Sequence, residues 1–153
     1  MSTKNISPVK HSKQIYEDFL KQLRLLGLGL DSCSADLKRG LYFEIKSDEQ
    51  IRQVAAEYEV LAIGPNYFNA GADFELRISR KGNKKREDEV ALFINCSFVA
   101  HFHLGKITSK EYIKQFVNSE FRLIVWPYYR QMINDLTARM AIQPLIVPLF
   151  EPE

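Results

Sequence analysis

The longest regular pattern in the sequence is an alternation of apolar and mixed residues that runs from Glu89 to Leu104. One side of this stretch carries Val90, Leu92, Ile94, Cys96, Phe98, Ala100, Phe102 and Leu104. Successive side chains of a β-strand point to opposite faces, so the pattern predicts one long strand with a wholly apolar face. A slip of one residue in pairing would expose that whole face, and the register should therefore be strongly determined.

A second alternating stretch, 74–79, precedes this strand and is separated from it by the charged residues 80–88. The two stretches predict a β-hairpin in an antiparallel sheet whose apolar face is covered by helices. The basic residues of the turn are followed at once by acidic residues 87–89, which cancel their field. A solvated turn is therefore favoured over a nucleic-acid site, which usually needs an extended basic stripe with aromatics.

Three stretches have apolar residues at the helical spacings of three and four. The first predicts a helix near 12–26. The capping-box residues 108–111 predict the start of a second helix that continues towards Val117. A third helix is expected after residues 118–119, and it contains a stripe made by Phe121, Val125, Tyr128, Met132, Leu136 and Met140.

Other segments give weaker strand and loop signals. Residues 41–46 alternate with period two and predict a half-buried strand, and residues 57–63 are rich in β-formers. The turn-forming residues 64–73 predict a loop that carries two adjacent aromatics, Tyr67 and Phe68. These aromatics either pin the loop to the core or belong to a binding surface.

The bulk properties indicate an ordinary globular chain. It has 153 residues, 46% of them hydrophobic, and a net charge of +2. We expect a flexible tail at 1–10 and a single domain at 11–153. The end of the chain, 142–150, contains two prolines and predicts an extended segment over apolar surface. No apolar stretch has the character of a secretory signal or a membrane span, so we expect a cytoplasmic protein.

Candidate chemical groups are few. His101 and His103 share one strand face, as two metal ligands would, but no third ligand is evident and two half-exposed histidines are the simpler interpretation. The two cysteines, Cys33 and Cys96, are far apart in sequence and favour a reducing environment. None of the common nucleotide-binding or hydrolase motifs occurs, so we predict no catalytic residues, no metal and no cofactor.

The end of the chain resembles the SecB-type protein-export chaperone family. In that family a long helix contains an aromatic-Pro-Tyr-x-Arg stretch, similar to residues 124–130 here, and a Leu- and Pro-rich segment follows it. Residues 91–98 also look like the family's third strand, and the likeness covers about 40–150, most specifically 121–150. The matching positions continue beyond the motif through Ile133, Leu136, Arg139, Pro144 and Pro148.

The resemblance implies an α+β fold with a four-stranded antiparallel sheet and helices packed on one face. An N-terminal helix would be an addition to the family core. It also implies a dimer or homotetramer, no cofactor, and ATP-independent holding of non-native polypeptides in apolar grooves. The groove walls would be a crossover loop and the long helix. Carried over by position, the client-binding residues of the loop wall would be Ile63, Tyr67 and Phe68. Nearby apolar lining would come from Tyr129, Ile133, Leu145 and Val147.

Two client classes follow from the resemblance, exported preproteins with SecA as a further partner, and antitoxins of toxin–antitoxin systems. Export members are usually acidic and have a polar C-terminal tail, whereas this chain is slightly basic and stops at Glu153. An alternative is a module dedicated to one partner, which would dock on the N-terminal stripe of Ile15, Phe19, Leu23 and Leu26. A second alternative is a metal or small-molecule protein that uses His101 and His103.

Overall fold

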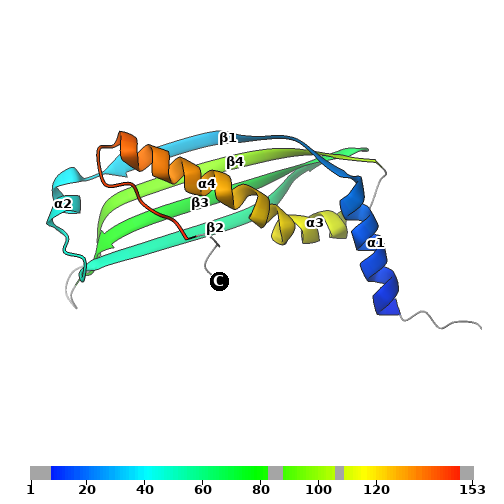
Figure 1. The fold of residues 1–153 in the computed structure, drawn as a ribbon, viewed down its shortest axis with the longest axis horizontal. Coiled ribbons are helices and arrows are strands. Elements are labelled where there is room, and N and C mark those ends of the chain that lie inside the picture. Colours follow the sequence, from blue (N-terminus) through cyan, green and yellow to red (C-terminus); the bar gives the residue numbers. More distant parts are fainter. Residues whose placement is uncertain (1–7, 83–87, 106–108, 149–153) are drawn as a thin grey trace, which may run out of the picture.

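The computed structural model describes residues 8–82, 88–105 and 109–148 of the chain (Figure 1). Within these residues lie helices α1 (Pro8–Gln22), α2 (Arg39–Glu44), α3 (Lys110–Asn118) and α4 (Glu120–Arg139), and strands β1 (Leu23–Leu37), β2 (Gln50–Ile63), β3 (Tyr67–Arg80) and β4 (Glu89–Leu104). The strands form one antiparallel sheet in the order β1-β4-β3-β2. The predicted α+β class, with a four-stranded antiparallel sheet and an added N-terminal helix, is confirmed.

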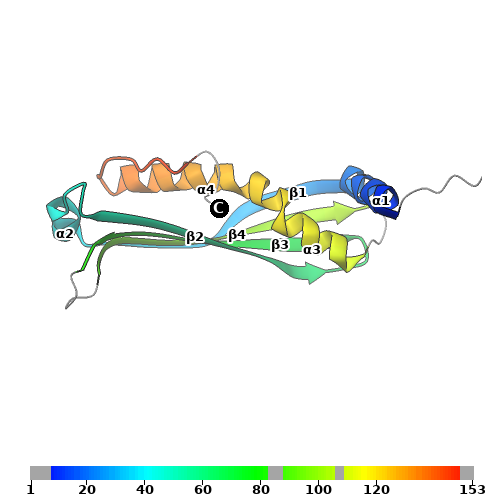
Figure 2. The same cartoon turned by 90° about the horizontal axis from the view of Figure 1, so that it is seen from below.

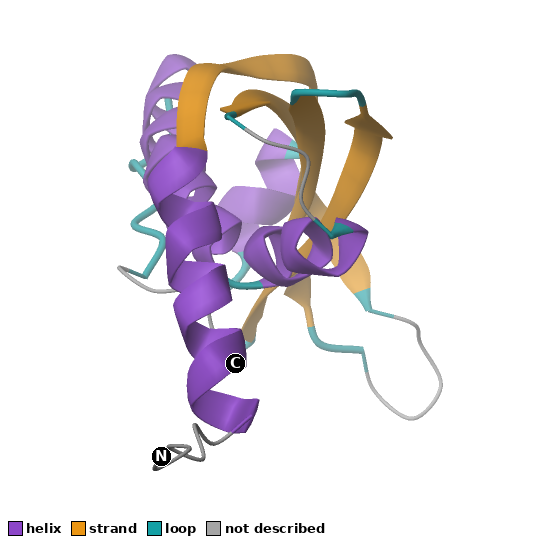
Figure 3. Cartoon of the chain, turned by 90° about the vertical axis from the view of Figure 1, so that its right-hand side faces the viewer, coloured by secondary structure: helices purple, strands orange, loops and turns teal. Residues whose placement is uncertain are grey.

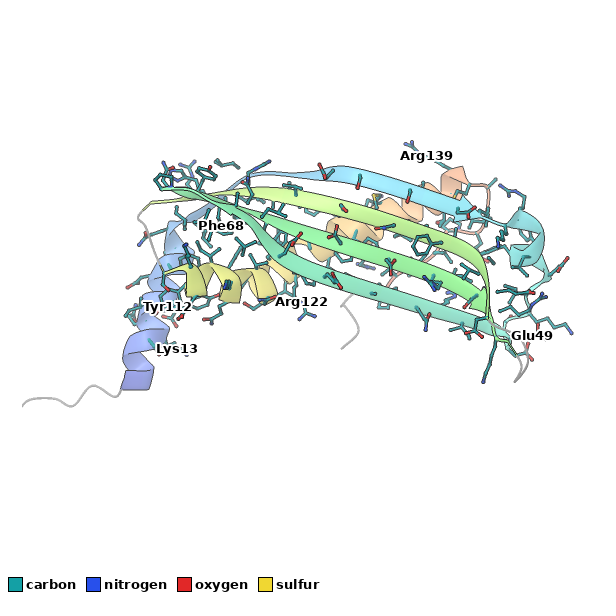
Figure 4. The ribbon with its side chains drawn as sticks, turned by 180° about the vertical axis from the view of Figure 1, so that it is seen from behind. Lys13, Glu49, Phe68, Tyr112, Arg122 and Arg139 are labelled. Atoms are coloured by element: carbon teal, nitrogen blue, oxygen red, sulfur yellow. The ribbon has the colours of Figure 1, made fainter. Side chains whose placement is uncertain are left out.

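The predicted hairpin forms the centre of this sheet. Phe74 pairs with Cys96 and Leu76 with Ile94, so the apolar rows of β3 and β4 share one face. Both rows are buried from Phe68 to Ile78 and from Leu92 to Leu104. Helices cover this face, and the opposite face is open (Figures 2 and 4). Part of the predicted turn, 83–87, lies outside the described residues.

The first predicted helix is correct in kind but wrong in extent. α1 begins at Pro8, within the predicted tail, and ends at Gln22. Residues 23–37, which were expected to finish a helix and form a loop, are instead the edge strand β1, paired with β4 along its length. Register shifts between Leu25 and Gly27 and between Leu30 and Ser32 break the alternation of β1, and this hid the strand from a search for period two.

The connection from β1 to β2 also differs from the expectation. The predicted strand at 41–46 is wrong, because most of it lies in the short helix α2. β1 and β2 are opposite edges of the sheet, so residues 38–49 must cross its end, and a helical turn does this compactly (Figure 1). The loop predicted at 64–73 shrinks to a turn at 64–66, since β3 already begins at Tyr67.

Aromatic packing fixes α4 over the middle of the sheet. The Tyr129 ring stacks on Phe74 with 4.2 Å between centroids and 11° between planes. The Trp126 ring also lies beside Phe74, with 5.9 Å between ring centroids. The predicted stripe is rotated relative to the buried one, which comprises Phe121, Val125, Trp126, Tyr129, Ile133 and Thr137.

The other two long helical segments pack at one end of the sheet (Figures 1 and 3). Ser109 caps α3 by accepting a hydrogen bond from the Glu111 backbone N–H. Thr108, the first residue of the predicted capping box, lies outside the described residues. Phe19 of α1 is buried against Tyr112 and Phe116 of α3. Of the predicted stripe, Phe19 therefore covers core, whereas Ile15 is 40% exposed and Leu23 and Leu26 belong to β1.

The segment after α4 is extended, as predicted, and buries Ile142, Leu145 and Val147. It turns back along α4 on the side of β2 (Figure 1). The buried hydroxyl of Thr137 accepts from the Leu145 backbone N–H at 3.1 Å and donates to the Ile133 carbonyl at 2.8 Å. The predicted end of this segment at 149–150 lies outside the described residues.

The Thr137 hydroxyl should hold this segment in place. Thr137→Val keeps the side-chain shape but leaves the buried Leu145 N–H without an acceptor, which costs about 1–3 kcal/mol. We expect that loss in chemical denaturation, together with faster proteolysis of residues 142–148. Thr137→Ser is the matched control and should keep slow proteolysis, because it retains the hydroxyl. Equal proteolysis of the two variants would contradict this role.

Pro127 lies inside α4, and its side chain is exposed. It cannot donate a hydrogen bond to the Leu123 carbonyl one turn earlier, and a proline in a helix interior costs about 3 kcal/mol relative to alanine. We therefore predict that Pro127→Ala raises the free energy of unfolding by about 2 kcal/mol, after allowing for the looser unfolded chain. Asn134→Ala, at another exposed position, should change it by about 0.5 kcal/mol. A loss of stability in Pro127→Ala would show instead that α4 needs the proline to pack.

Candidate polypeptide-binding surface

The helical layer is too small for the sheet that it covers. Strands of 14 to 16 residues are about 45–50 Å long at roughly 3.3 Å per residue. The 20-residue α4 is about 30 Å long and roughly 10 Å wide. It runs diagonally across the strands (Figure 1). Some of the apolar face must therefore stay uncovered, and the location of that part is informative.

The uncovered part includes the edge strand β1. Leu25 is directly opposite Phe102 and Leu30 is opposite Phe98, so these leucines point to the helix-covered face. Their β4 partners are buried, yet Leu25 is 43% exposed and Leu30 is 49% exposed. We call the residues of β1 on this face between its two end leucines, Leu23 and Leu37, the inner row; they are Leu25, Leu28, Leu30, Cys33 and Ala35.

One flank of α4 is turned towards the side of β1 (Figure 1). The other flank is covered, because the Trp126 indole and the Arg130 guanidinium donate hydrogen bonds to the carbonyls of Pro148 and Val147, each at 3.0 Å. At 100° per residue, Tyr128 lies on the flank turned away from that segment, together with the half-buried Ile124 and Met132. The Tyr128 side chain is 52% exposed. This free flank and the inner row make up the β1–α4 surface.

The backbone edge of β1 has the same apolar character. Its outer edge pairs with no other strand in the described part of the chain. Residues 25–30 contain no charge and no proline, the usual features that protect an exposed edge from pairing. β2, the opposite edge, carries charged residues such as Arg52, Glu57 and Glu59. β1 is therefore the edge that is ready to accept another chain.

Three residues predicted for the loop wall do not lie in the crossover connection. That connection is 38–49, where Phe43 is 64% exposed, and not the region 63–68 that the resemblance implied. Ile63 ends β2 and Tyr67 begins β3, at the end of the sheet opposite to α2 (Figure 1). Phe68 is fully buried and contributes to the core.

The two aromatics at the start of β3 have different roles. The Phe68 ring stacks on the Phe102 ring with 4.9 Å between centroids, so Phe68 pins the chain to the core. Tyr67 is 43% exposed, which fits the surface alternative. Its ring lies so close to Gly64 that a Cβ there would come within 2.0 Å of it, and only glycine permits this approach.

The other four predicted binding residues are buried in the single chain. Tyr129 and Ile133 form the sheet-facing side of α4, and Leu145 and Val147 are buried side chains of the C-terminal segment. The Tyr129 hydroxyl has no hydrogen-bond partner among the described residues, and burial raises the pKa of this phenol. These side chains position the surface, but a client could not contact them without displacing the core. Their role in client binding remains a prediction.

The two histidines considered as metal ligands form no recognisable metal site with other described residues. His101 Nδ1 lies 2.7 Å from the Asn69 side-chain oxygen, and His103 is half-buried two residues further along the strand. Among the residues that the structure describes, no three His, Cys, Asp or Glu side chains come together as a metal site. No helix of the described chain is long and apolar enough to cross a membrane.

Comparison with solved structures identifies the architecture. The chain matches the Mycobacterium tuberculosis SecB-like chaperone Rv1957, solved in complex with a ChAD peptide from the Rv1956 HigA1 antitoxin, with a TM-score of 0.75. The match covers 92% of this chain and 99% of that one at 18% identity. The chain therefore has the SecB-like fold, as the resemblance implied. A Streptococcus agalactiae protein of unknown function matches at a TM-score of 0.45 and 8% identity, which supports no argument. No family model and no curated protein matches the sequence.

Proposed function

We propose that this protein is an ATP-independent chaperone that holds unfolded or partly folded polypeptides on its β1–α4 surface. The observation that carries the proposal is the exposure of the inner row of β1 beside a free apolar flank of α4. A single chain that leaves Leu25, Leu30 and Tyr128 open to water loses the free energy that their burial would contribute. Exposed apolar side chains of this kind, when several occur on one face, usually serve an interaction.

The chemistry of the surface suits many clients. Leucine, methionine and tyrosine side chains offer apolar area without demanding one partner shape. Binding of this kind needs no bond making. A client segment would gain mainly by burying its own apolar side chains.

The client class can be narrowed. The SecB-like fold is shared with a chaperone that was solved with an antitoxin peptide. We therefore favour an antitoxin segment as the client over an exported preprotein delivered to SecA. In both cases the bound segment is a short apolar stretch of an incompletely folded chain, and the cytoplasm is where such chains are met.

The edge of β1 suits a second copy of the chain. Backbone groups along 25–30 can extend the sheet across a two-fold axis, while the inner row still faces the client. We propose a dimer built in this way, with a tetramer as a pair of such dimers. Pairing would also remove an aggregation-prone edge from solution.

Client binding should depend on the inner row. Covering the exposed half of one leucine contributes about 1 kcal/mol, so Leu25→Ser with Leu30→Ser should weaken the Kd for a labelled, permanently unfolded protein at least tenfold. Fluorescence anisotropy measures the Kd, and light scattering of an aggregating client measures the loss of protection. Because both positions are exposed, the melting temperature should change little.

The matched control for this experiment replaces two leucines that are exposed elsewhere. Leu61 lies on the open face of the sheet over Gly71, and Leu123 points outward from α4. Leu61→Ser with Leu123→Ser removes a similar apolar area and should bind as the wild type does. If the two double variants lose affinity equally, binding depends on general surface hydrophobicity and the assignment to the β1–α4 surface fails.

Assembly should depend on the same strand. Leu26 is 65% exposed at a register shift of β1, and Leu26→Lys would bring two positive charges together across a two-fold β1 contact. We expect this variant to dissociate towards monomer in gel filtration with light scattering, while Leu61→Lys on the opposite edge strand stays associated. A monomeric wild type would contradict the proposed dimer.

A further inference from the structure

The two cysteines of the chain, distant in sequence, meet across two neighbouring strands. Cys33 of β1 is the direct antiparallel partner of Cys96 of β4, and their sulfur atoms are 3.5 Å apart. Both are free thiols. They differ in access, because Cys33 is exposed on the inner row whereas Cys96 is fully buried.

The backbone geometry fits a disulfide between them. Directly opposed residues of antiparallel strands have Cα atoms about 4.5 or 5.5 Å apart, and both values lie in the range that a disulfide spans, about 4.4–6.8 Å. The sulfurs, now 3.5 Å apart, need to approach to about 2 Å. β1 can supply this movement, since it is paired on one side and has a register shift between Leu30 and Ser32, just before Cys33.

We propose that Cys33 and Cys96 form an oxidation site, at which a small disulfide such as glutathione disulfide converts the two thiols into a reversible cross-strand disulfide. In the first step the Cys33 thiolate attacks one glutathione sulfur, forms a mixed disulfide and releases one glutathione thiolate. In the second step the Cys96 sulfur attacks the Cys33 sulfur, and the Cys96 proton passes to the departing second glutathione, which leaves as its thiol. In sum, two protein thiols are oxidised and one glutathione disulfide is reduced to two glutathione molecules.

The difference in environment assigns the two roles. Cys33 can be reached from solvent and is the attacking thiol. Burial raises the pKa of Cys96, which keeps it a thiol, and the neighbouring Cys33 sulfur adds to this shift. Cys96 is therefore inert toward external oxidants and reacts when a mixed disulfide is held beside it. A buried resolving thiol also protects the exposed one from lasting modification.

The disulfide would clamp β1 onto the sheet. β1 is the least buried of the four strands and is held by one neighbour, so local opening should begin there. A bond at Cys33 ties the middle of this strand to β4 and closes a long loop, which restricts the unfolded chain. If β1 carries the client, which rests on the proposed function, the bond acts on the client surface itself. The disulfide does not depend on that function.

The test uses the reduced full-length protein and glutathione disulfide, with no client present. The wild type should end with the mass of two hydrogens lost, no retained glutathione and a Cys33–Cys96 cross-linked peptide, all reversed by dithiothreitol. Its melting temperature should rise by about 5–10 °C, and amide exchange in β1 should slow. Cys96→Ala should trap one glutathione on Cys33, whereas Cys33→Ser should not react while folded.

Three results would overturn the proposal. They are a wild type that does not react, one that retains glutathione on Cys33, and one that cross-links chains through Cys33. Cys33→Ser changes an exposed residue, and we expect it to keep the fold. The result with this variant is therefore decisive even if Cys96→Ala unfolds. Reaction at Cys96 in the folded Cys33→Ser variant would also count against the assigned roles. None of these measurements involves client binding, so their failure is distinguishable from failure of the chaperone proposal.

Discussion

The docking of one long helix on a larger sheet is the constraint on which the rest of the structure depends. Stacking of Tyr129 on Phe74 and the neighbouring Trp126 fix α4 over the central hairpin. A helix so placed cannot reach both edges of a four-stranded sheet. Its position decides which apolar side chains are buried and which stay in contact with water.

One flank of α4 is covered by a further segment of the chain and the other is not, and this asymmetry creates the candidate surface. On the side of β2, the C-terminal segment closes the gap through hydrogen bonds from Trp126 and Arg130 and through the Thr137 hydroxyl. On the side of β1, no segment of the described chain does the same, and the inner row stays open. The candidate surface thus consists of apolar residues of β1 that neither α4 nor another segment of the described chain covers.

Much of the fold could be predicted from the sequence, because its central elements obey a single period. The strand from Glu89 to Leu104 alternates without interruption, and α4 is long enough to show its helical spacing. β1 could not be recognised in the same way. Its register shifts at Leu25 and Leu30 break the alternation, and its pairing with β4 is a tertiary interaction that local sequence does not report. The leucines of 23–30 were the available signal for this strand.

The missed strand β1 also affected where the site was expected. The loop wall was placed at Ile63, Tyr67 and Phe68, whereas the crossover connection is 38–49 and Phe68 belongs to the core. Tyr129 and Ile133 were chosen because the long helix was expected to line a groove. They were carried over by position from the resemblance, which does not say which side of the helix faces the sheet, and both lie on the buried side.

The account is tested most directly by hydrogen exchange of the assembled protein, with and without a permanently unfolded client. Exchange should slow in β1 and in the α4 segment around Tyr128 when the client is bound, while the β2 edge is unchanged. Protection confined to β2, or protection of neither edge, would contradict the central claim that the uncovered inner row of β1 receives the client.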